Sequence, residues 1–176
     1  MSSLRIVGGR DGGRSLRAPR GKQIHPMREG MRSALFSMLG DITDLHVLDA
    51  FGGSGALGLE AASRGAAEVT IVDNSPKAQR IIEQNIATVG AENVTQVKAN
   101  VFSWLSVVAR NSFDVVFADP PYQVFDAERI ERLVPYVVDG GLLVVSAPAD
   151  EEFEFERLQL VEHREYGGGS LHFWRK

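Results

Sequence analysis

Short apolar runs alternate with longer amphipathic segments between residues 45 and 147. This alternation constrains the fold more than any other feature of the chain, because strands that are connected through helices pair in parallel. We expect strands at residues 45–51, 68–73, 94–99, 113–119 and 141–147. We expect helices at residues 56–64, from Ser75-Pro76 onwards, at 101–110 and at 126–136. The repeated strand–helix–strand units predict a parallel sheet that is covered by helices on both faces.

Both ends of the chain depart from this pattern. The last 20 residues contain two β-like runs around Gly167-Gly-Gly169, so we expect an antiparallel hairpin at the end of the sheet. Near the N-terminus, Asp11-Gly12 is typical of a tight turn with positive φ angles, and it predicts a small hairpin over residues 4–18. A helix is expected at residues 27–39, where apolar side chains recur at helical spacing: Met27, Met31, Ala34, Leu35 and Met38.

Together these elements predict the fold class. It is a doubly wound, Rossmann-like α/β fold with a mostly parallel seven-stranded sheet, an antiparallel C-terminal hairpin and a small N-terminal β-hairpin. A chain of 176 residues has room for about one domain of this kind. We divide it into a basic hairpin extension at residues 1–26 and the main domain at residues 27–176.

The composition excludes several classes of function. The chain has no cysteine, which excludes a disulfide framework, thiolate zinc sites and a cysteine nucleophile. No window approaches 18 consecutive apolar residues, so we expect no membrane span. The four histidines are scattered, and we interpret them as surface or core residues. We expect a cytoplasmic, monomeric protein without a bound metal.

Charge is divided unequally along the chain. Residues 1–32 carry eight Lys or Arg and two Asp or Glu, a net charge of +6, whereas the rest of the chain carries −10. A basic segment on an acidic body favours a polyanion bound on one face, although a merely solvated tail would have the same composition. The candidate RNA-binding residues are Arg5, Arg10, Arg14, Arg17, Arg20, Lys22, Arg28 and Arg32.

A glycine-rich loop follows the first expected strand. Gly53, Gly55 and Gly58 fit the pattern G-x-G-x-x-G between a strand and a helix, where glycine permits a tight turn and close approach to a ligand. Asp73 ends the next strand, 24 residues beyond Asp49, and its carboxylate can accept hydrogen bonds from ribose hydroxyls. The pattern indicates a nucleoside-bearing cofactor. The alternative is a glycine turn that only packs helix against strand.

Asp49 distinguishes between two such cofactors. A dinucleotide places its pyrophosphate against bare backbone N–H groups at the start of the helix. Asp49 ends the strand just before the loop, and its negative charge would repel a pyrophosphate. The same charge suits the ammonium and sulfonium groups of S-adenosylmethionine, so the sequence favours a methyl donor.

The stretch "VVFADPPY" ends the fourth expected strand. In a doubly wound sheet the first and fourth strands flank the switch point, so Asp119 and Gly55 should be neighbours there. Asp119 and the carbonyl group of Pro120 can accept hydrogen bonds from an exocyclic amine and favour a pyramidal nitrogen. Neither Pro120 nor Pro121 has an N–H group to donate, and Tyr122 can stack on a flat base. The stretch therefore predicts a site for an aromatic amine; the alternative is a strand end whose Tyr covers an edge.

The chain resembles the class I S-adenosylmethionine-dependent methyltransferases. More narrowly, it resembles the bacterial 16S ribosomal RNA guanine-N2 methyltransferases of the RsmD type, whose usual target is called guanine 966. The resemblance rests on "RIVGGRDGGRSL", "LDAFGGSGALGLEAASRGA", "ADPPY" and "YGGGSLHFWR" and covers nearly the whole chain. Two stretches depart from the family pattern: His25-Pro26-Met27 with Met31-Arg32-Ser33, and Ser146-Ala147, where the family often has a glutamate.

The resemblance implies roles for particular residues and a 16S rRNA or small-subunit partner. It implies cofactor binding by Asp49, Gly52, Gly53, Gly55, Asp73, Asn74, Asn100 and Val101. It implies a catalytic role, with binding of the target guanine, for Asp119, Pro120, Pro121 and Tyr122.

Three alternative functions remain open at this point. "DPPY" also serves methylation of adenine or cytosine in DNA and of glutamine in proteins, but such enzymes normally carry an added recognition domain. An NAD-dependent oxidoreductase is disfavoured by Asp49. A non-catalytic RNA-binding assembly protein would have little need of the intact "DPPY".

Overall fold

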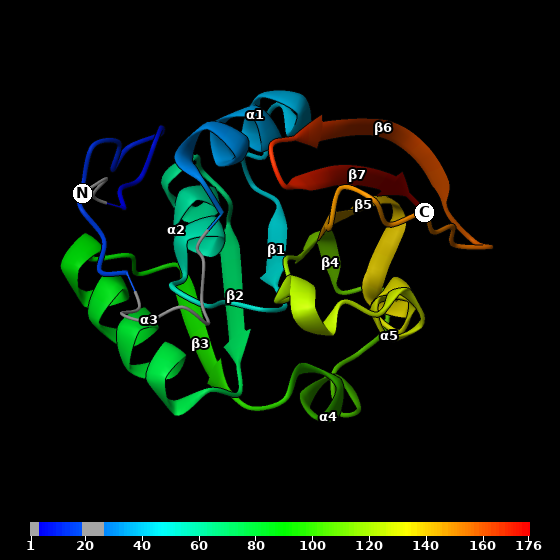
Figure 1. The fold of residues 1–176 in the computed structure, drawn as a ribbon. Helices are drawn as coiled ribbons and strands as arrows, with labels where there is room; N and C mark the ends of the chain where they lie inside the picture. The colour runs from blue at the N-terminus through cyan, green and yellow to red at the C-terminus, as the bar shows by residue number, and fades with distance from the viewer. Residues whose placement is uncertain (1–3, 19–26) are drawn as a thin grey trace.

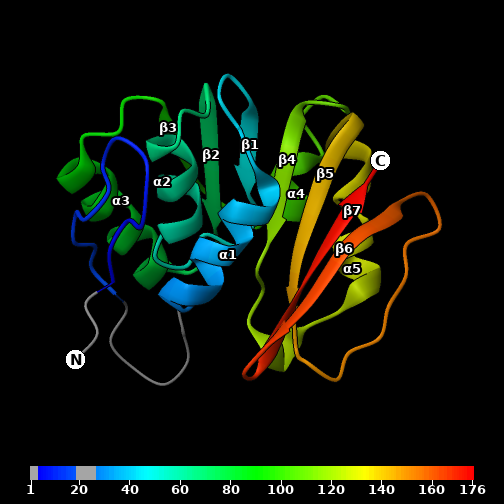
Figure 2. The same cartoon turned by 90° about the horizontal axis from the view of Figure 1, so that it is seen from above.

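The computed structural model describes residues 4–18 and 27–176. Its seven-stranded sheet has the order β3-β2-β1-β4-β5-β7-β6. The strands are β1 (His46–Asp49), β2 (Glu68–Asp73), β3 (Val94–Lys98), β4 (Phe113–Ala118), β5 (Val137–Ala147), β6 (Gln159–Tyr166) and β7 (Gly169–Arg175). The pairs among β1 to β5 are parallel, and β7 runs antiparallel to both β5 and β6 (Figures 1 and 2). The predicted fold class and the switch point between β1 and β4 are confirmed.

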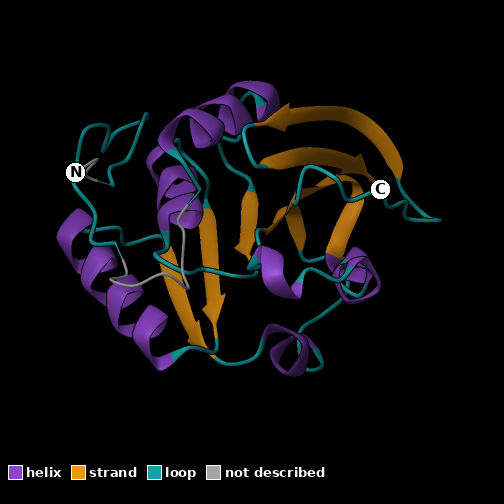
Figure 3. Cartoon of the chain, viewed as in Figure 1, coloured by secondary structure: helices purple, strands orange, loops and turns teal. Residues whose placement is uncertain are grey.

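Helices cover both faces of this sheet (Figure 3). They are α1 (Glu29–Leu39), α2 (Ala56–Ser63), α3 (Pro76–Val89), α4 (Val101–Leu105) and α5 (Ala127–Glu131), with 3₁₀ turns at η1 (Tyr122–Val124) and η2 (Val134–Tyr136). One hydrophobic core contains residues of α1, α2 and α3, and a second core contains residues of α4 and α5. Each helix follows its strand closely, so the loops that begin the helices gather at the carboxyl ends of the parallel strands.

Local signals in the sequence explain where several helices begin. Ser75 caps α3, with its hydroxyl accepting from the N–H of Ala78, and Pro76 occupies the first helical position as expected. The side chain of Asn100 caps α4 by accepting from two backbone N–H groups. Gly55 precedes α2 with φ 78°, a left-handed conformation that glycine adopts without strain.

Two predicted helices are shorter than expected. The segment 101–110 is helical only to Leu105, and the segment 126–136 is helical only to Glu131 before it re-forms as η2. In the second case Pro135 lacks an N–H group and restricts Val134, which prevents a continuous α-helix. Strand β5 begins four residues earlier than predicted, and its pairing with β4 shifts register between the Phe113–Val137 and Val115–Leu142 pairs.

The N-terminal hairpin differs from its prediction. Residues 4–18 form a loop with a single antiparallel bridge, between Arg5 and Ser15. The positive φ angles lie at Gly9 (77°) and Gly13 (87°) and not at Asp11-Gly12. Asp11 is instead buried, because its N–H group donates to the hydroxyl of Ser63 at 2.9 Å. The conformation of this loop is determined by its contact with α2. The turn propensity of Asp11-Gly12 contains no information about that contact.

Candidate active site

A cavity of about 890 Å³ opens at the carboxyl ends of β1, β2, β4 and β5. The structure brings most of the predicted site residues together here. Those that line it are Gly52, Gly53, Asp73, Asn74, Asn100, Val101, Asp119, Pro120, Pro121 and Tyr122. Asp49 and Gly55 are not among the lining residues; they lie in the strand end and loop that support the wall.

The glycines of the loop have different functions. A Cβ atom at Gly58 would lie 2.6 Å from Ile71, and one at Gly52 would lie 2.5 Å from the same side chain, so both positions let α2 and the loop pack against β2. Gly53 and Gly55 have positive φ angles of 56° and 78° and form the turn itself. The packing interpretation of the motif therefore applies to Gly52 and Gly58, whereas Gly53 and Gly55 have the turn conformation that the motif predicts.

Asp73 connects the loop to the next strand. Its two carboxylate oxygens accept from the N–H groups of Gly53 and Ser75, each at 2.8 Å. Burial raises the pKa of Asp73, and these two hydrogen bonds oppose the rise. The carboxylate is thus fixed in the cavity wall and keeps lone pairs for a ligand.

Asp49 is almost completely buried beneath the loop, with 1% of its surface exposed. One carboxylate oxygen accepts from the N–H of Gly58 at 3.0 Å, and Oδ1 has no hydrogen-bond partner among the described residues. Burial raises the pKa of Asp49 to about 7, with smaller contributions from the charges of Asp119 and Asp73. The structure therefore places an acidic group with spare acceptor capacity close to the cavity.

The Asp-Pro-Pro-Tyr stretch leaves β4 at the opposite side of the switch point. Burial raises the pKa of Asp119 to about 6. Tyr122 lies half-buried in the cavity wall, where its hydroxyl group is 2.8 Å from Oγ of Ser146. The ring is therefore less exposed than the sequence suggested, because the end of β5 holds its hydroxyl end.

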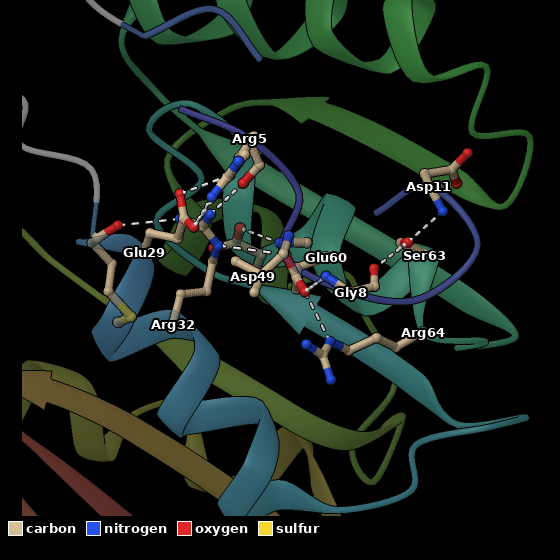
Figure 4. Close-up of polar contacts among 12 residues, drawn as sticks. Arg5, Gly8, Asp11, Glu29, Arg32, Asp49, Glu60, Ser63 and Arg64 are labelled. Carbon is tan, nitrogen blue, oxygen red and sulfur yellow. Dashed lines mark hydrogen bonds and ion pairs between the residues drawn. The ribbon is translucent and has the colours of Figure 1, made fainter. Parts of the chain in front are cut away.

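The N-terminal segment contacts the domain next to this site (Figure 4). The buried carboxylate of Glu60 accepts from the N–H groups of Val7 and Gly8 at 2.7 and 2.8 Å and from Nε of Arg64 at 2.8 Å. Asn85 makes a second connection, because its side chain accepts from the N–H of Arg17 and donates to the carbonyl of Ser54 in the glycine loop. Glu60 could not be identified as this anchor from the sequence, because one acidic residue in the expected helix carries no signal of burial.

Arg32 is a correction to the predicted RNA-binding set. It has no exposed surface, its Nε atom lies 3.5 Å from Oε2 of Glu60, and its guanidinium group donates to the carbonyl oxygens of Arg5 and Met27. Its burial lowers its pKa, but it remains a structural cation inside the protein. The charge pattern could not distinguish this arginine from its exposed neighbours.

The other predicted RNA-binding residues divide into three groups. Arg17 and Arg28 are exposed, and Arg10 and Arg14 are exposed but paired with Asp11 at 3.2 and 3.5 Å. Arg5 is exposed but bonded to Glu29 at 2.8 Å. Arg20 and Lys22 lie outside the described residues.

The fold and the site define a class, that of Rossmann-like methyltransferases. A solved structure of an Escherichia coli protein described as the putative methyltransferase yhhF is similar, with a TM-score of 0.86 at 30% identity over 99% of this chain and 98% of that one. The structure of a Thermus thermophilus protein, titled hypothetical, is also similar, with a TM-score of 0.83 at 33% identity over 98% of this chain and 99% of that one.

The particular family follows from two sequence matches. The family model described as "Conserved hypothetical protein 95" matches residues 4–175. The Escherichia coli K12 protein named ribosomal RNA small subunit methyltransferase D is 35% identical over 154 residues, covering 87% of this chain and 76% of that protein. This chain belongs to that family, the RsmD family, as the resemblance indicated.

Proposed function

We propose that this protein transfers a methyl group from S-adenosylmethionine to the exocyclic N2 amine of a guanine in 16S ribosomal RNA. The observation that carries the proposal is the meeting, in one cavity, of the glycine loop with Asp73 and the Asp-Pro-Pro-Tyr stretch. The name of the Escherichia coli relative, a ribosomal RNA small subunit methyltransferase, supports the substrate class.

The charge of the cavity fits this cofactor. Asp49, Asp73 and Asp119 lie close together, and no ion pair within residues 4–18 and 27–176 neutralises any of them. Three carboxyl groups that take part in none of the described ion pairs favour a ligand with ammonium and sulfonium groups over a pyrophosphate. When bound, the cofactor supplies an electrophilic methyl group. Asp73 would hold its ribose and Asn100 and Val101 would lie beside its adenine.

Asp119 and Pro120 would bind the target amine. A carboxylate and a carbonyl group accept the two amine hydrogens, which favours a pyramidal nitrogen with an available lone pair. The nitrogen forms one new bond to carbon and must then lose one proton. The pKa of Asp119, about 6, allows its carboxylate to be present at neutral pH, so either Asp119 or water can take that proton. Tyr122 would stack on the base, a contact worth about 1–3 kcal/mol.

The RNA would be held by the exposed basic residues of the N-terminal segment. Arg10, Arg14 and Arg17 are exposed side chains of a loop that the buried Glu60 and Asn85 fix in place, and the guanidinium group of Arg14 also donates to the carbonyl oxygens of Thr88 and Val89. Among the helices that the structure describes, none has the length and apolar character of a membrane span.

Transfer of a tritiated methyl group tests the proposal. Purified protein is incubated with labelled S-adenosylmethionine and either naked 16S rRNA or assembled small subunits, and the product RNA is digested to nucleosides. We expect label in N2-methylguanosine. Label in methyladenosine or methylcytidine would overturn the proposed amine, and the absence of transfer to either RNA substrate would favour an assembly protein. Calorimetry should show S-adenosylhomocysteine binding without NAD binding.

A further inference from the structure

Two residues that lie far from Tyr122 in sequence, Ser146 and Gly169, contact its side chain and hold it in place. Ser146, at the end of β5, is 2% exposed, lines the cavity and lies 2.8 Å from the hydroxyl of Tyr122. Burial raises the pKa of the Tyr122 phenol, so the phenol is protonated at neutral pH, and either hydroxyl group can donate in this hydrogen bond. A tyrosine that only covered an edge would need no such buried partner.

Gly169 is the second residue that holds the Tyr122 side chain. A Cβ atom at this position would lie 2.2 Å from the hydroxyl oxygen of Tyr122 and 2.9 Å from Cζ. Gly169 has no positive φ angle, so space for the ring, and not backbone conformation, requires glycine here. Gly167, in the same turn, has nothing within 4 Å of its Cβ position. The C-terminal hairpin therefore forms part of the site through one particular glycine.

Ser146 also affects Asp119, which lines the same cavity. Burial raises the pKa of Asp119, and the hydroxyl group of Ser146 opposes that rise. A serine hydroxyl has a single proton, so Ser146 can donate to only one group at a time. Its hydrogen-bond partner in the structure is the hydroxyl of Tyr122.

We propose that Ser146 is a positioning residue for the target base: its hydroxyl, together with the open space at Gly169, holds the Tyr122 ring in one orientation in the cavity that Asp119 also lines. This inference rests on the proposed function and extends it to the selection of a flat, amine-bearing ring. Such a ring must place its face on Tyr122 while its amine meets Asp119, so rotation of either group would separate stacking from methyl transfer.

Ser146→Ala tests the proposal in single-turnover assays at saturating RNA and cofactor. We expect the rate to fall by up to about tenfold, the range for loss of a hydrogen bond between neutral groups. The loss also removes an interaction that lowers the pKa of Asp119, so the acidic limb of the pH–rate profile should move to higher pH. Ser146→Thr, which keeps a hydroxyl group, should restore the limb. Ser170→Ala removes a buried hydroxyl on the adjacent strand β7, outside the cavity lining, and should change neither property.

Two further variants separate positioning from general loss of structure. Adding Tyr122→Phe to Ser146→Ala should cost little more than Ser146→Ala alone, because the phenol then has no partner to lose. Gly169→Ala should lower the rate, Gly167→Ala should not, and Tyr122→Phe should partly rescue Gly169→Ala by removing the colliding oxygen.

The outcomes distinguish this inference from the proposed function. Wild-type protein that methylates no RNA would refute the function. Wild-type activity with an unchanged rate and unchanged acidic limb in Ser146→Ala would refute the positioning role alone. A crystal structure of Ser146→Ala decides the same point without activity: we expect the Tyr122 ring to leave its place against Gly169, and a ring that has not moved overturns the proposal.

Discussion

The cavity has two halves that are built in different ways. In the half formed by β1, β2 and β3, the carboxylates of Asp49 and Asp73 accept hydrogen bonds from backbone N–H groups of the glycine loop and the start of α3. In the half formed by β4, β5 and β7, Tyr122 is held by the side chain of Ser146 and by the absence of a side chain at Gly169. The first half depends on backbone conformation and the second on individual side chains.

Substitutions in the two halves of the cavity should therefore have different energetic consequences. Backbone donors are part of the folded chain, so changes in the first half should affect folding or cofactor affinity. A hydroxyl bridge and a missing Cβ atom contribute little to the core, so changes in the second half should affect the reaction while the fold survives. The predictions below test this division, beginning with the largest expected effect.

Glu60→Ala should give the largest loss of stability. The substitution leaves the buried Arg32 without its carboxylate and frees the N–H groups of Val7 and Gly8. Removing one partner of a buried ion pair costs about 3–5 kcal/mol, which urea unfolding measures. The exposed pair of Glu83 with Lys98 is the matched control, and Glu83→Ala should cost less than about 1 kcal/mol. Equal losses in the two variants would contradict the role of Glu60 as an anchor.

Asp119→Ala should lower the methylation rate by about two orders of magnitude or more without a comparable loss of stability. Asp119 acts most strongly as the amine nitrogen becomes pyramidal, whereas Tyr122→Ala should mainly raise the RNA concentration that the reaction needs. Single-turnover rates at saturating RNA separate the two effects. A nearly unchanged rate in Asp119→Ala would show that the Asp-Pro-Pro-Tyr stretch is only a strand end.

Asp73→Ala should weaken binding of S-adenosylhomocysteine by about tenfold or more, because the ligand loses an acceptor and the N–H of Gly53 loses its partner. Isothermal titration calorimetry measures the change. Asp139→Ala, at an exposed position in β5 away from the cavity lining, is the control and should bind normally. Normal binding in Asp73→Ala as well would remove the ribose contact from the proposed site.

These expectations also show which parts of the molecule can be predicted from its sequence. The fold class, the switch point between β1 and β4 and the first half of the cavity follow from signals that lie close together in the chain, as for Gly53 and Asp73. Ser146 and Gly169 could not be found in this way, because they meet Tyr122 only after β5 pairs with β7. Arg32 was misassigned for the same reason: its buried partner Glu60 lies 28 residues away, and charge alone does not reveal burial.

Asp49→Asn should change the pH dependence of stability. The folded-state pKa of Asp49, about 7, lies above the usual unfolded value of about 3.9, so the folded protein holds a proton that the unfolded chain releases. The wild type should therefore lose stability as pH rises between about 4 and 7, by about 1 kcal/mol for each pH unit, and the variant should lose less. Urea unfolding at several pH values measures this slope, and identical slopes would mean that Asp49 is ionised in the folded protein.

Arg17→Gln should give the smallest effect, and it tests the N-terminal segment without unfolding it. Deleting residues 1–22 would remove the buried Ile6 and Leu16 from the core, so a single exposed charge is the cleaner change. Arg17 contacts Asn85 through its backbone, which the substitution preserves. If its side chain binds one phosphate, the slope of log binding constant against log salt should fall by about 0.7–0.9, with no change in cofactor affinity. Arg110→Gln, an exposed charge near the amino end of β4, should leave the slope unchanged. Equal slopes in wild type and Arg17→Gln would place the RNA backbone elsewhere on the protein.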